Sequence, residues 1–147
     1  LHFLRGGAAI DSMELDAFIG PCTVLQVPGG VITGEYVDKH FPKKCKRLLI
    51  KGGGRAFFMD SSAEELSGRG LMLIGTDSLS VGCAGNETAP HKAFMQGGTA
   101  ILEGLDLSEV QPGEYFLFAP PVLYDGLEAA PVRAVLISDY IFWSGNH

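Results

Sequence analysis

Cysteine is scarce in this sequence, and the few cysteines are widely spaced. Only three of the 147 residues are cysteine, Cys22, Cys45 and Cys83, and they form no C-x-x-C pair. Disulfide-stapled secreted domains and cysteine zinc sites need more thiols at closer spacing, so the sequence argues against both classes. We therefore expect a protein of the reducing cytoplasm.

Long apolar runs are also missing. No stretch approaches the ~18 residues of a membrane span and no signal peptide is recognisable, so we expect no membrane association. The net charge of −6 argues against a nucleic-acid binder, which normally has a basic face. Residues 39–47 are locally basic, and we interpret them as a solvated loop face. Because residue 1 is Leu, we expect the natural N-terminus to be missing.

Three common catalytic motifs are absent from the chain: G-x-S-x-G, the phosphate-binding P-loop and H-E-x-x-H. The corresponding serine hydrolase, nucleotide hydrolase and helix-borne zinc protease mechanisms therefore have no support.

Glycine and apolar residues are abundant. The chain has 20 glycines, 46% hydrophobic residues and 19% charged residues, which fits one compact α/β domain over residues 1–147. Because predicted βα units alternate with consecutive strands, we expect a mixed sheet. The predicted strands are residues 22–27, Arg47–Lys51, 71–75, Ala100–Leu102, 115–119 and 132–138. The predicted helices are residues 12–18, Gly34–His40 capped by Thr33, a segment starting at Ser61 and Ser62, and residues 91–95.

Two of these elements carry specific expectations. Residues 71–75 are continuously apolar, which is typical of a strand buried on both faces. Ser61 with Glu64, and Ser62 with Glu65, have the spacing of a capping box, in which a hydroxyl and a carboxylate pair with backbone N–H groups at a helix start.

Glu103 and His91 are the first candidates for a functional site. Glu103 follows Ile101 and Leu102, so its carboxylate lies either at a sheet edge in water or beside a partner or metal inside the protein. His91 lies twelve residues earlier, and imidazole and carboxylate are usual ligands of zinc and manganese. Two ligands at this spacing are a weak signal, and a histidine at a helix start is also common as a simple polar residue.

A polar loop follows the apolar strand. Asp77, Ser78 and Ser80 come after residues 71–75, and loops at the carboxyl ends of strands often form binding sites in α/β proteins. These side chains are candidates for substrate binding. The alternative is a tight turn in which Asp and Ser satisfy the local backbone.

Three stretches together resemble the cyclase family of metal-dependent hydrolases, which includes bacterial kynurenine formamidase. Residues 70–81 (GLMLIGTDSLSV) are similar to the family pattern G-x-x-L-V-G-I-D-x-x-S-V. His91, residues 101–105 (ILEGL) and residues 113–115 resemble H-x-x-L, I-L-E-N-L and P-G-x-Y, and residues 130–136 (APVRAVL) resemble G-A-P-V-R-A-V. Leu1, His2 and Phe3 look like the end of the family motif H-x-G-T-H-x-D-x-P-x-H, and residues 18–25 resemble the strand that follows it.

The resemblance implies a β/β/α fold of mixed sheets with a barrel-like core, a site with two divalent ions, zinc or manganese, and a homodimer or larger assembly. It implies that His91 and Glu103 are metal ligands and that His2 is a catalytic acid and base. The family's other ligands, two histidines and an aspartate, belong to motif positions before His2, which this sequence does not contain. From this departure we expect the 147-residue chain to bind metal poorly.

The sequence is therefore compatible with two functions. The first is a hydrolase of a small-molecule amide or formamide, of the kynurenine formamidase type, in which metal-activated water attacks the carbonyl. The second is a metal-free small-molecule-binding or assembly module that keeps the fold without catalysis.

Overall fold

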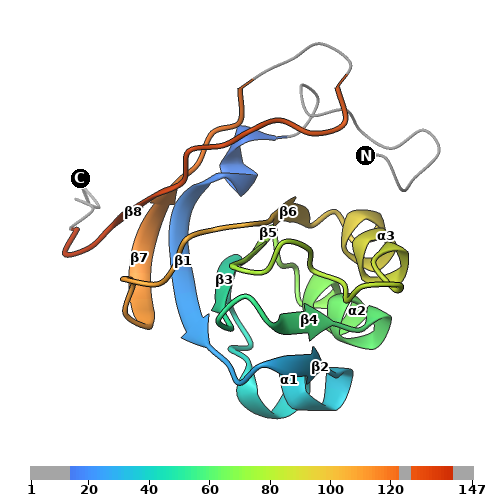
Figure 1. The fold of residues 1–147 in the computed structure, drawn as a ribbon. Helices are drawn as coiled ribbons and strands as arrows, with labels where there is room; N and C mark the ends of the chain where they lie inside the picture. Colours follow the sequence, from blue (N-terminus) through green and yellow to red (C-terminus); the bar gives the residue numbers. More distant parts are fainter. Residues whose placement is uncertain (1–13, 123–126, 141–147) are drawn as a thin grey trace.

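Six strands form a mixed sheet at the centre of the molecule (Figure 1). The structure is a computed structural model that describes residues 14–122 and 127–140. The strand order is β6-β5-β3-β1-β7-β8. The strands β1, β3, β5 and β6 are parallel, whereas β7 is antiparallel to β1 and to β8. Their bounds are β1 (Ile19–Gln26), β3 (Arg47–Lys51), β5 (Leu73–Thr76), β6 (Ala100–Leu102), β7 (Gly113–Phe118) and β8 (Val135–Ile137).

A two-stranded sheet and three α-helices cover one side of the large sheet (Figure 1). The small parallel sheet joins β2 (Gly30–Ile32) to β4 (Ala56–Phe58). The helices are α1 (Gly34–His40), α2 (Asp60–Gly68) and α3 (Thr88–Gln96), and a short 3-10 helix, η2 (Leu15–Ala17), precedes β1. Large sheet, small sheet and helices together give the β/β/α arrangement that the sequence predicted.

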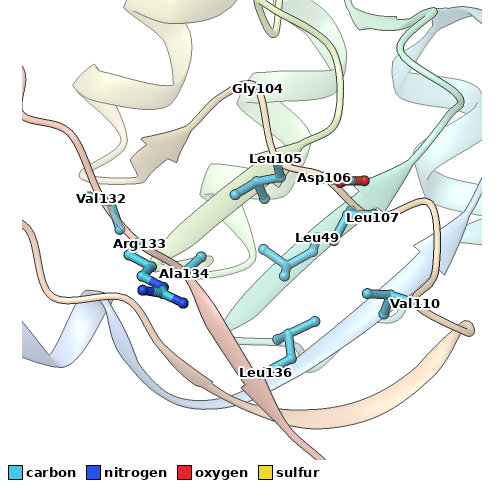
Figure 2. Close-up of a pocket in the computed structure, with 10 residues that line it drawn as sticks. All are labelled: Leu49, Gly104, Leu105, Asp106, Leu107, Val110, Val132, Arg133, Ala134 and Leu136. Carbon is cyan, nitrogen blue, oxygen red and sulfur yellow. The ribbon is translucent and has the colours of Figure 1, made fainter.

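The chain that follows β6 covers the face of the large sheet away from the helices. Leu136 of β8, the edge strand of the same sheet, also packs into the core cluster on this face. Leu49, Leu73 and Leu117 are almost fully buried there, and Leu107 joins the same cluster. Gly75 has no side chain on this face because a Cβ would lie 2.4 Å from a methyl of Leu49. The packing is incomplete near Leu49, where a cavity opens between β3 and the segment leading into β8 (Figure 2).

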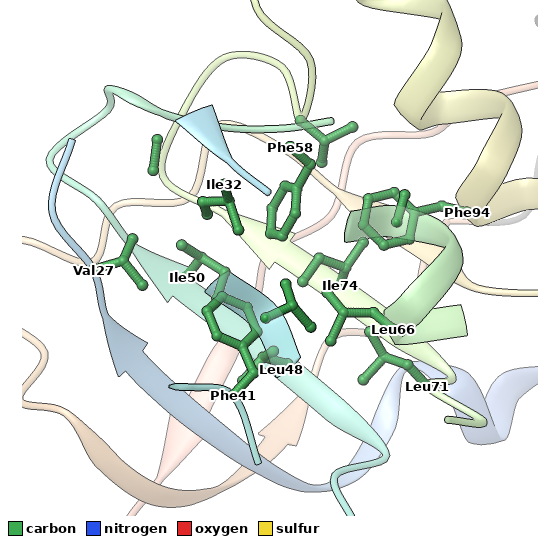
Figure 3. Close-up of a cluster of buried hydrophobic side chains, with 14 of the residues drawn as sticks. Val27, Ile32, Phe41, Leu48, Ile50, Phe58, Leu66, Leu71, Ile74 and Phe94 are labelled. Atoms are coloured by element: carbon green, nitrogen blue, oxygen red, sulfur yellow. The ribbon is translucent and has the colours of Figure 1, made fainter. Parts of the chain in front are cut away.

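The opposite face carries the second core cluster (Figure 3). Leu48 and Ile50 of β3 and Ile74 of β5 point into it, alternating with the residues that face the other side. Phe58 of β4 packs edge to face on Phe94 of α3, with ring centroids 5.3 Å apart. Through this contact the core fixes the position of α3 relative to the sheet.

Most of the predicted elements are confirmed. The predicted strand at residues 71–75 corresponds to β5, whose four residues are all buried. Thr33 caps α1 by accepting a hydrogen bond from the backbone N–H of Tyr36, as expected. The small sheet was not predicted from the sequence, because β2 and β4 have only three residues each.

The capping box prediction is wrong. Helix α2 begins one residue earlier, at Asp60, and its N-cap Met59 offers no side-chain hydrogen bond. The hydroxyl of Ser61 instead accepts from the backbone N–H of Gly34, and that of Ser62 donates to the carbonyl of Met59. Ser61 therefore makes a tertiary contact and Ser62 a local bond to the N-cap carbonyl, and neither hydroxyl forms the predicted capping bond. The predicted helix at residues 12–18 is reduced to η2, and its first two residues lie outside the described residues.

No helix in the described part of the chain is long and apolar enough to span a bilayer.

The contrast between two leucines tests the burial of β5. Leu73→Ala removes a fully buried side chain, so we expect a loss of about 2–5 kcal/mol in the free energy of unfolding. Leu79→Ala is the matched control, because Leu79 is 91% exposed and its truncation should change stability by less than about 0.5 kcal/mol. Urea unfolding monitored by circular dichroism measures both. Equal losses in the two variants would contradict the assignment of β5 as a buried strand.

Candidate functional site

His91 and Glu103 lie in direct contact at the carboxyl end of β6. The Nε2 atom of His91 is 2.7 Å from Oε1 of Glu103. His91 is on the first turns of α3, and Glu103 is the first residue after β6. The fold therefore brings together the two residues that the sequence named. Glu103 follows the edge strand β6 and is partly exposed, so it lies at a sheet edge and is also paired with His91.

Backbone groups hold both side chains in place. The carbonyl of Glu87 lies 2.6 Å from Nδ1 of His91, so Nδ1 carries a proton and donates to it. The backbone N–H of Val81 donates to Oε1 of Glu103 at 2.8 Å. Nε2 is therefore the ring nitrogen of His91 that faces the Glu103 carboxylate.

The two groups favour each other's charged form. Burial of His91 acts against its charge, but the hydrogen bonds to Glu103 and to the Glu87 carbonyl outweigh burial and raise its pKa above 6.5. Burial likewise acts to raise the pKa of Glu103, but the hydrogen bonds from His91 and Val81 outweigh it and lower that pKa below 4.5. Without a metal, the pair is an imidazolium beside a carboxylate in weakly acidic solution.

The same two atoms fit a divalent ion. A neutral imidazole nitrogen and a carboxylate oxygen are both ordinary ligands of zinc and manganese. With bond lengths of ~2.0–2.2 Å, two ligand atoms of a tetrahedral ion lie roughly 3.4 Å apart, which is a small displacement from the present contact. The hydrogen bond from Nδ1 to Glu87 is the outer contact that usually orients a metal-binding histidine. Among the residues that the structure describes, no group of three or more His, Cys, Asp or Glu is placed to hold an ion.

The loop after β5 contains the other candidates, and they have different surroundings. The carboxylate of Asp77 accepts from the backbone N–H groups of Gly52 and Gly53, so it anchors the glycine-rich turn after β3. Ser78 is fully buried, and its hydroxyl donates to the carbonyl of Ala56. Both side chains therefore bond to backbone groups of distant residues and not to the local turn, and their role in substrate binding stays a prediction.

Ser80 is the member of this loop that lies at the site. Its hydroxyl accepts from the backbone N–H of Gly82, and it lies close enough to Glu103 to contribute to the lowered pKa of that carboxyl. It is half-buried, so part of it is accessible. His2, the predicted acid and base, lies outside the described residues.

Sequence reasoning missed three contributors because they act through the backbone. Val81 and Glu87 supply a main-chain N–H and a main-chain carbonyl, to which residue type gives no clue. Gly82 allows the loop to approach the start of α3, since a Cβ there would lie 2.6 Å from Cα of Glu87 and 2.9 Å from Pro90. A glycine shortly before Pro90 was the available signal for this close approach.

The chain is similar to curated proteins named kynurenine formamidase. The chain is 33% identical to the kynurenine formamidase of Delftia acidovorans over 148 residues, which covers 92% of this chain and 71% of that protein. It is 35% identical to the kynurenine formamidase of Bordetella pertussis over 149 residues, with the same coverage of both chains. No family model matches the chain.

Solved structures agree with these relatives. A structure described as a potential metal-dependent hydrolase with cyclase activity superposes with a TM-score of 0.84 at 27% identity, covering 92% of this chain and 73% of that one. A predicted metal-dependent hydrolase from Bacillus stearothermophilus gives a TM-score of 0.77 at 27% identity and covers 92% and 71%. Isatin hydrolase A from Ralstonia solanacearum, at 17% identity and a TM-score of 0.69, shares the fold.

The chain is about one third identical to these relatives, covers 71% of their length and shares the fold of the solved hydrolases. It therefore belongs to the kynurenine formamidase family of cyclase-type hydrolases.

Proposed function

We propose that this protein hydrolyses a small-molecule amide or formamide with the help of a divalent metal, zinc or manganese. The observation that carries the proposal is the contact of His91 Nε2 with Glu103 Oε1 at the end of β6. Relatives named kynurenine formamidase and neighbours described as metal-dependent hydrolases support this type of reaction and cofactor.

In this proposal each residue of the site has a separate task. Glu87 orients His91 through its carbonyl, and Val81 orients Glu103 through its N–H, so both ligand atoms are preorganised. His91 and Glu103 would hold a divalent ion, which would supply a water of lowered pKa and would polarise the carbonyl of the substrate. Ser80 is placed to meet polar groups of the substrate beside Glu103. His2, by resemblance to the family motif, transfers a proton to the leaving amine.

A second candidate is a metal-free binding or assembly module of the same fold. The observation that favours it is that His91 and Glu103 have no third potential ligand among the described residues. Catalytic zinc sites generally use three protein ligands, so two alone would hold an ion weakly.

Substitution of the proposed ligands separates the two candidates. We expect His91→Ala and Glu103→Ala to lose any bound zinc or manganese and to lower the hydrolysis of a formylated aryl amine by more than about 10²-fold, the upper end of the loss from removing an outer contact of a metal ligand. His40→Ala is the matched control, because His40 is exposed and stacks on Tyr36 away from the site. Metal analysis and an absorbance assay measure both quantities. Activity that survives in both ligand variants would refute the metal assignment, and a wild-type chain without metal or activity would favour the second candidate.

The pKa shifts of the pair predict a pH window in metal-free protein. Because the pKa of His91 is raised above 6.5, its contribution to stability is complete below pH 6.5 and is lost as the pH rises through the raised value. Because the pKa of Glu103 is lowered below 4.5, its contribution is complete above pH 4.5 and is lost as the pH falls through the lowered value. The stability difference between wild type and Glu103→Gln should therefore be largest between pH 4.5 and 6.5.

Urea unfolding in EDTA between pH 3.5 and 9 measures this difference. Glu64→Gln on the exposed side of α2 is the control, and its difference from wild type should not peak in this window. A difference for Glu103→Gln that is constant with pH would show that the two side chains do not form an ion pair.

We also propose that the protein is a cytoplasmic homodimer that uses the outer face of β7 and β8. Phe118, Val135 and Ile137 are 43–45% exposed, and their strand register places them on one face. An apolar surface on an edge strand is a usual site of subunit contact. The cysteines Cys22, Cys45 and Cys83 are free thiols, which supports a reducing location.

Light scattering tests the assembly. We expect wild type to be a dimer at micromolar concentration, and we expect Ile137→Glu to be a folded monomer because a carboxylate would have to be buried in the interface. Val31→Glu is the control, since Val31 is 56% exposed on the small sheet, away from this face. A monomeric wild type, or a dimer that Ile137→Glu leaves intact, would contradict the proposed interface.

A further inference from the structure

A cavity of about 440 Å³ lies on the face of the large sheet that α3 does not cover (Figure 2). Its volume falls within the range of small-molecule sites in proteins, roughly 300–1,000 Å³. The chain after β6 forms one wall, the segment leading into β8 forms the other, and Leu49 of β3 forms the floor. The apolar lining residues are Leu49, Leu105, Leu107, Val110, Val132 and Leu136.

Two charged side chains stand on opposite sides of this apolar lining. Figure 2 shows Arg133 beside Ala134 on one side and Asp106 beside Leu107 on the other. Asp106 is already engaged, because its carboxylate accepts from the backbone N–H and the hydroxyl of Ser108. Arg133 has no hydrogen bond or ion pair with any of the described residues. Arg133 is exposed and lines one end of the apolar cavity.

The cavity is separate from the His91 and Glu103 pair. The carboxylate of Glu103 is directed to His91 and to the N–H of Val81, on the side of the sheet that the helices cover. Gly104, the next residue, turns the chain with a positive φ of 68°, and Leu105 enters the core cluster of the other face. A molecule in the cavity would contact the chain after Glu103 without touching its carboxylate.

We propose that this cavity is a second binding site, which takes a small molecule with an aromatic or aliphatic body and one carboxylate held by Arg133. The apolar walls remove the body from water, which is the main favourable contribution to binding. The planar guanidinium pairs with a carboxylate through two parallel hydrogen bonds, which fixes the direction of the ligand. Asp106 at the other end repels an anion and so favours the same orientation.

Titration of the ¹⁵N-labelled 147-residue chain with two matched probes tests this proposal. The probes are 2-naphthoate and the neutral 2-naphthylmethanol, which have the same ring system. We expect amide shifts to centre on Gly104, Leu105, Leu107 and Ala134, and we expect the acid to bind at least about tenfold more tightly than the alcohol. Equal affinities for the two probes, shifts centred elsewhere, or no shifts at millimolar probe would overturn the proposal.

Variants identify the two parts of the site. Arg133→Gln should reduce the affinity for the acid to that for the alcohol, whereas Arg55→Gln, at an exposed arginine on another loop, should leave both affinities unchanged. Ala134→Leu should fill the cavity and weaken both probes. Glu103→Gln should alter neither, so the result does not depend on the proposed hydrolase. Retention of the preference for the acid in Arg133→Gln would overturn the role of Arg133.

Discussion

Four of the six strands of the sheet are parallel neighbours, and parallel strands need cover on both faces. This requirement organises the rest of the molecule. The small sheet and the three helices provide the cover on one face, and the chain after β6 together with β8 provides it on the other. The loops that leave the carboxyl ends of β5 and β6 must therefore cross the same edge of the sheet in opposite directions. The backbone N–H of Gly104 donates to the carbonyl of Ser78 where these two loops meet.

The candidate site is a product of this crossing. The loop after β5 supplies the N–H of Val81, which holds the Glu103 carboxylate, and then continues into α3, which carries His91. Phe94 anchors α3 in the core three residues after His91, on a neighbouring face of the helix. The geometry of the two proposed ligands thus depends on apolar packing below them and on main-chain hydrogen bonds beside them.

The sequence predicted the parts of the fold that have a periodic or motif signal. The apolar run of β5 and the Thr33 cap of α1 were found because each has a direct physical signature. The capping box at Ser61 and Ser62 was misassigned because the Ser61 hydroxyl has a tertiary partner that no local pattern reveals, while the Ser62 hydroxyl donates to the carbonyl of Met59. The small sheet was missed because three residues are too few for a period to be recognised.

The site residues were likewise predicted only where side-chain chemistry or a motif gave a signal. His91 and Glu103 were named by side-chain chemistry and by the resemblance to the family, whereas from residue spacing alone the pair was only a weak signal. The roles of Val81 and Glu87 could not be predicted, since every residue offers the same N–H and carbonyl. The substrate-binding role expected for Asp77 and Ser78 stays a prediction. Their residue types suit a binding loop, but the fold uses both side chains to tie that loop to the segment between β3 and β4.

The pairing of β1 with β7 has a consequence for the order of folding. Thr23 of β1 contacts Glu114 of β7 across 91 residues of sequence, whereas successive parallel strands in the other half lie only roughly 25 residues apart. Closing the longer loop costs more chain entropy, so the contacts between β1 and β7 form later than those between the parallel strands. The half that contains β1 to β6 and the His91–Glu103 pair should therefore form first during synthesis, and the cavity walled by Arg133 should form only when β7 and β8 dock. Until that step, the leucines of β3 and β5 remain open to chaperones.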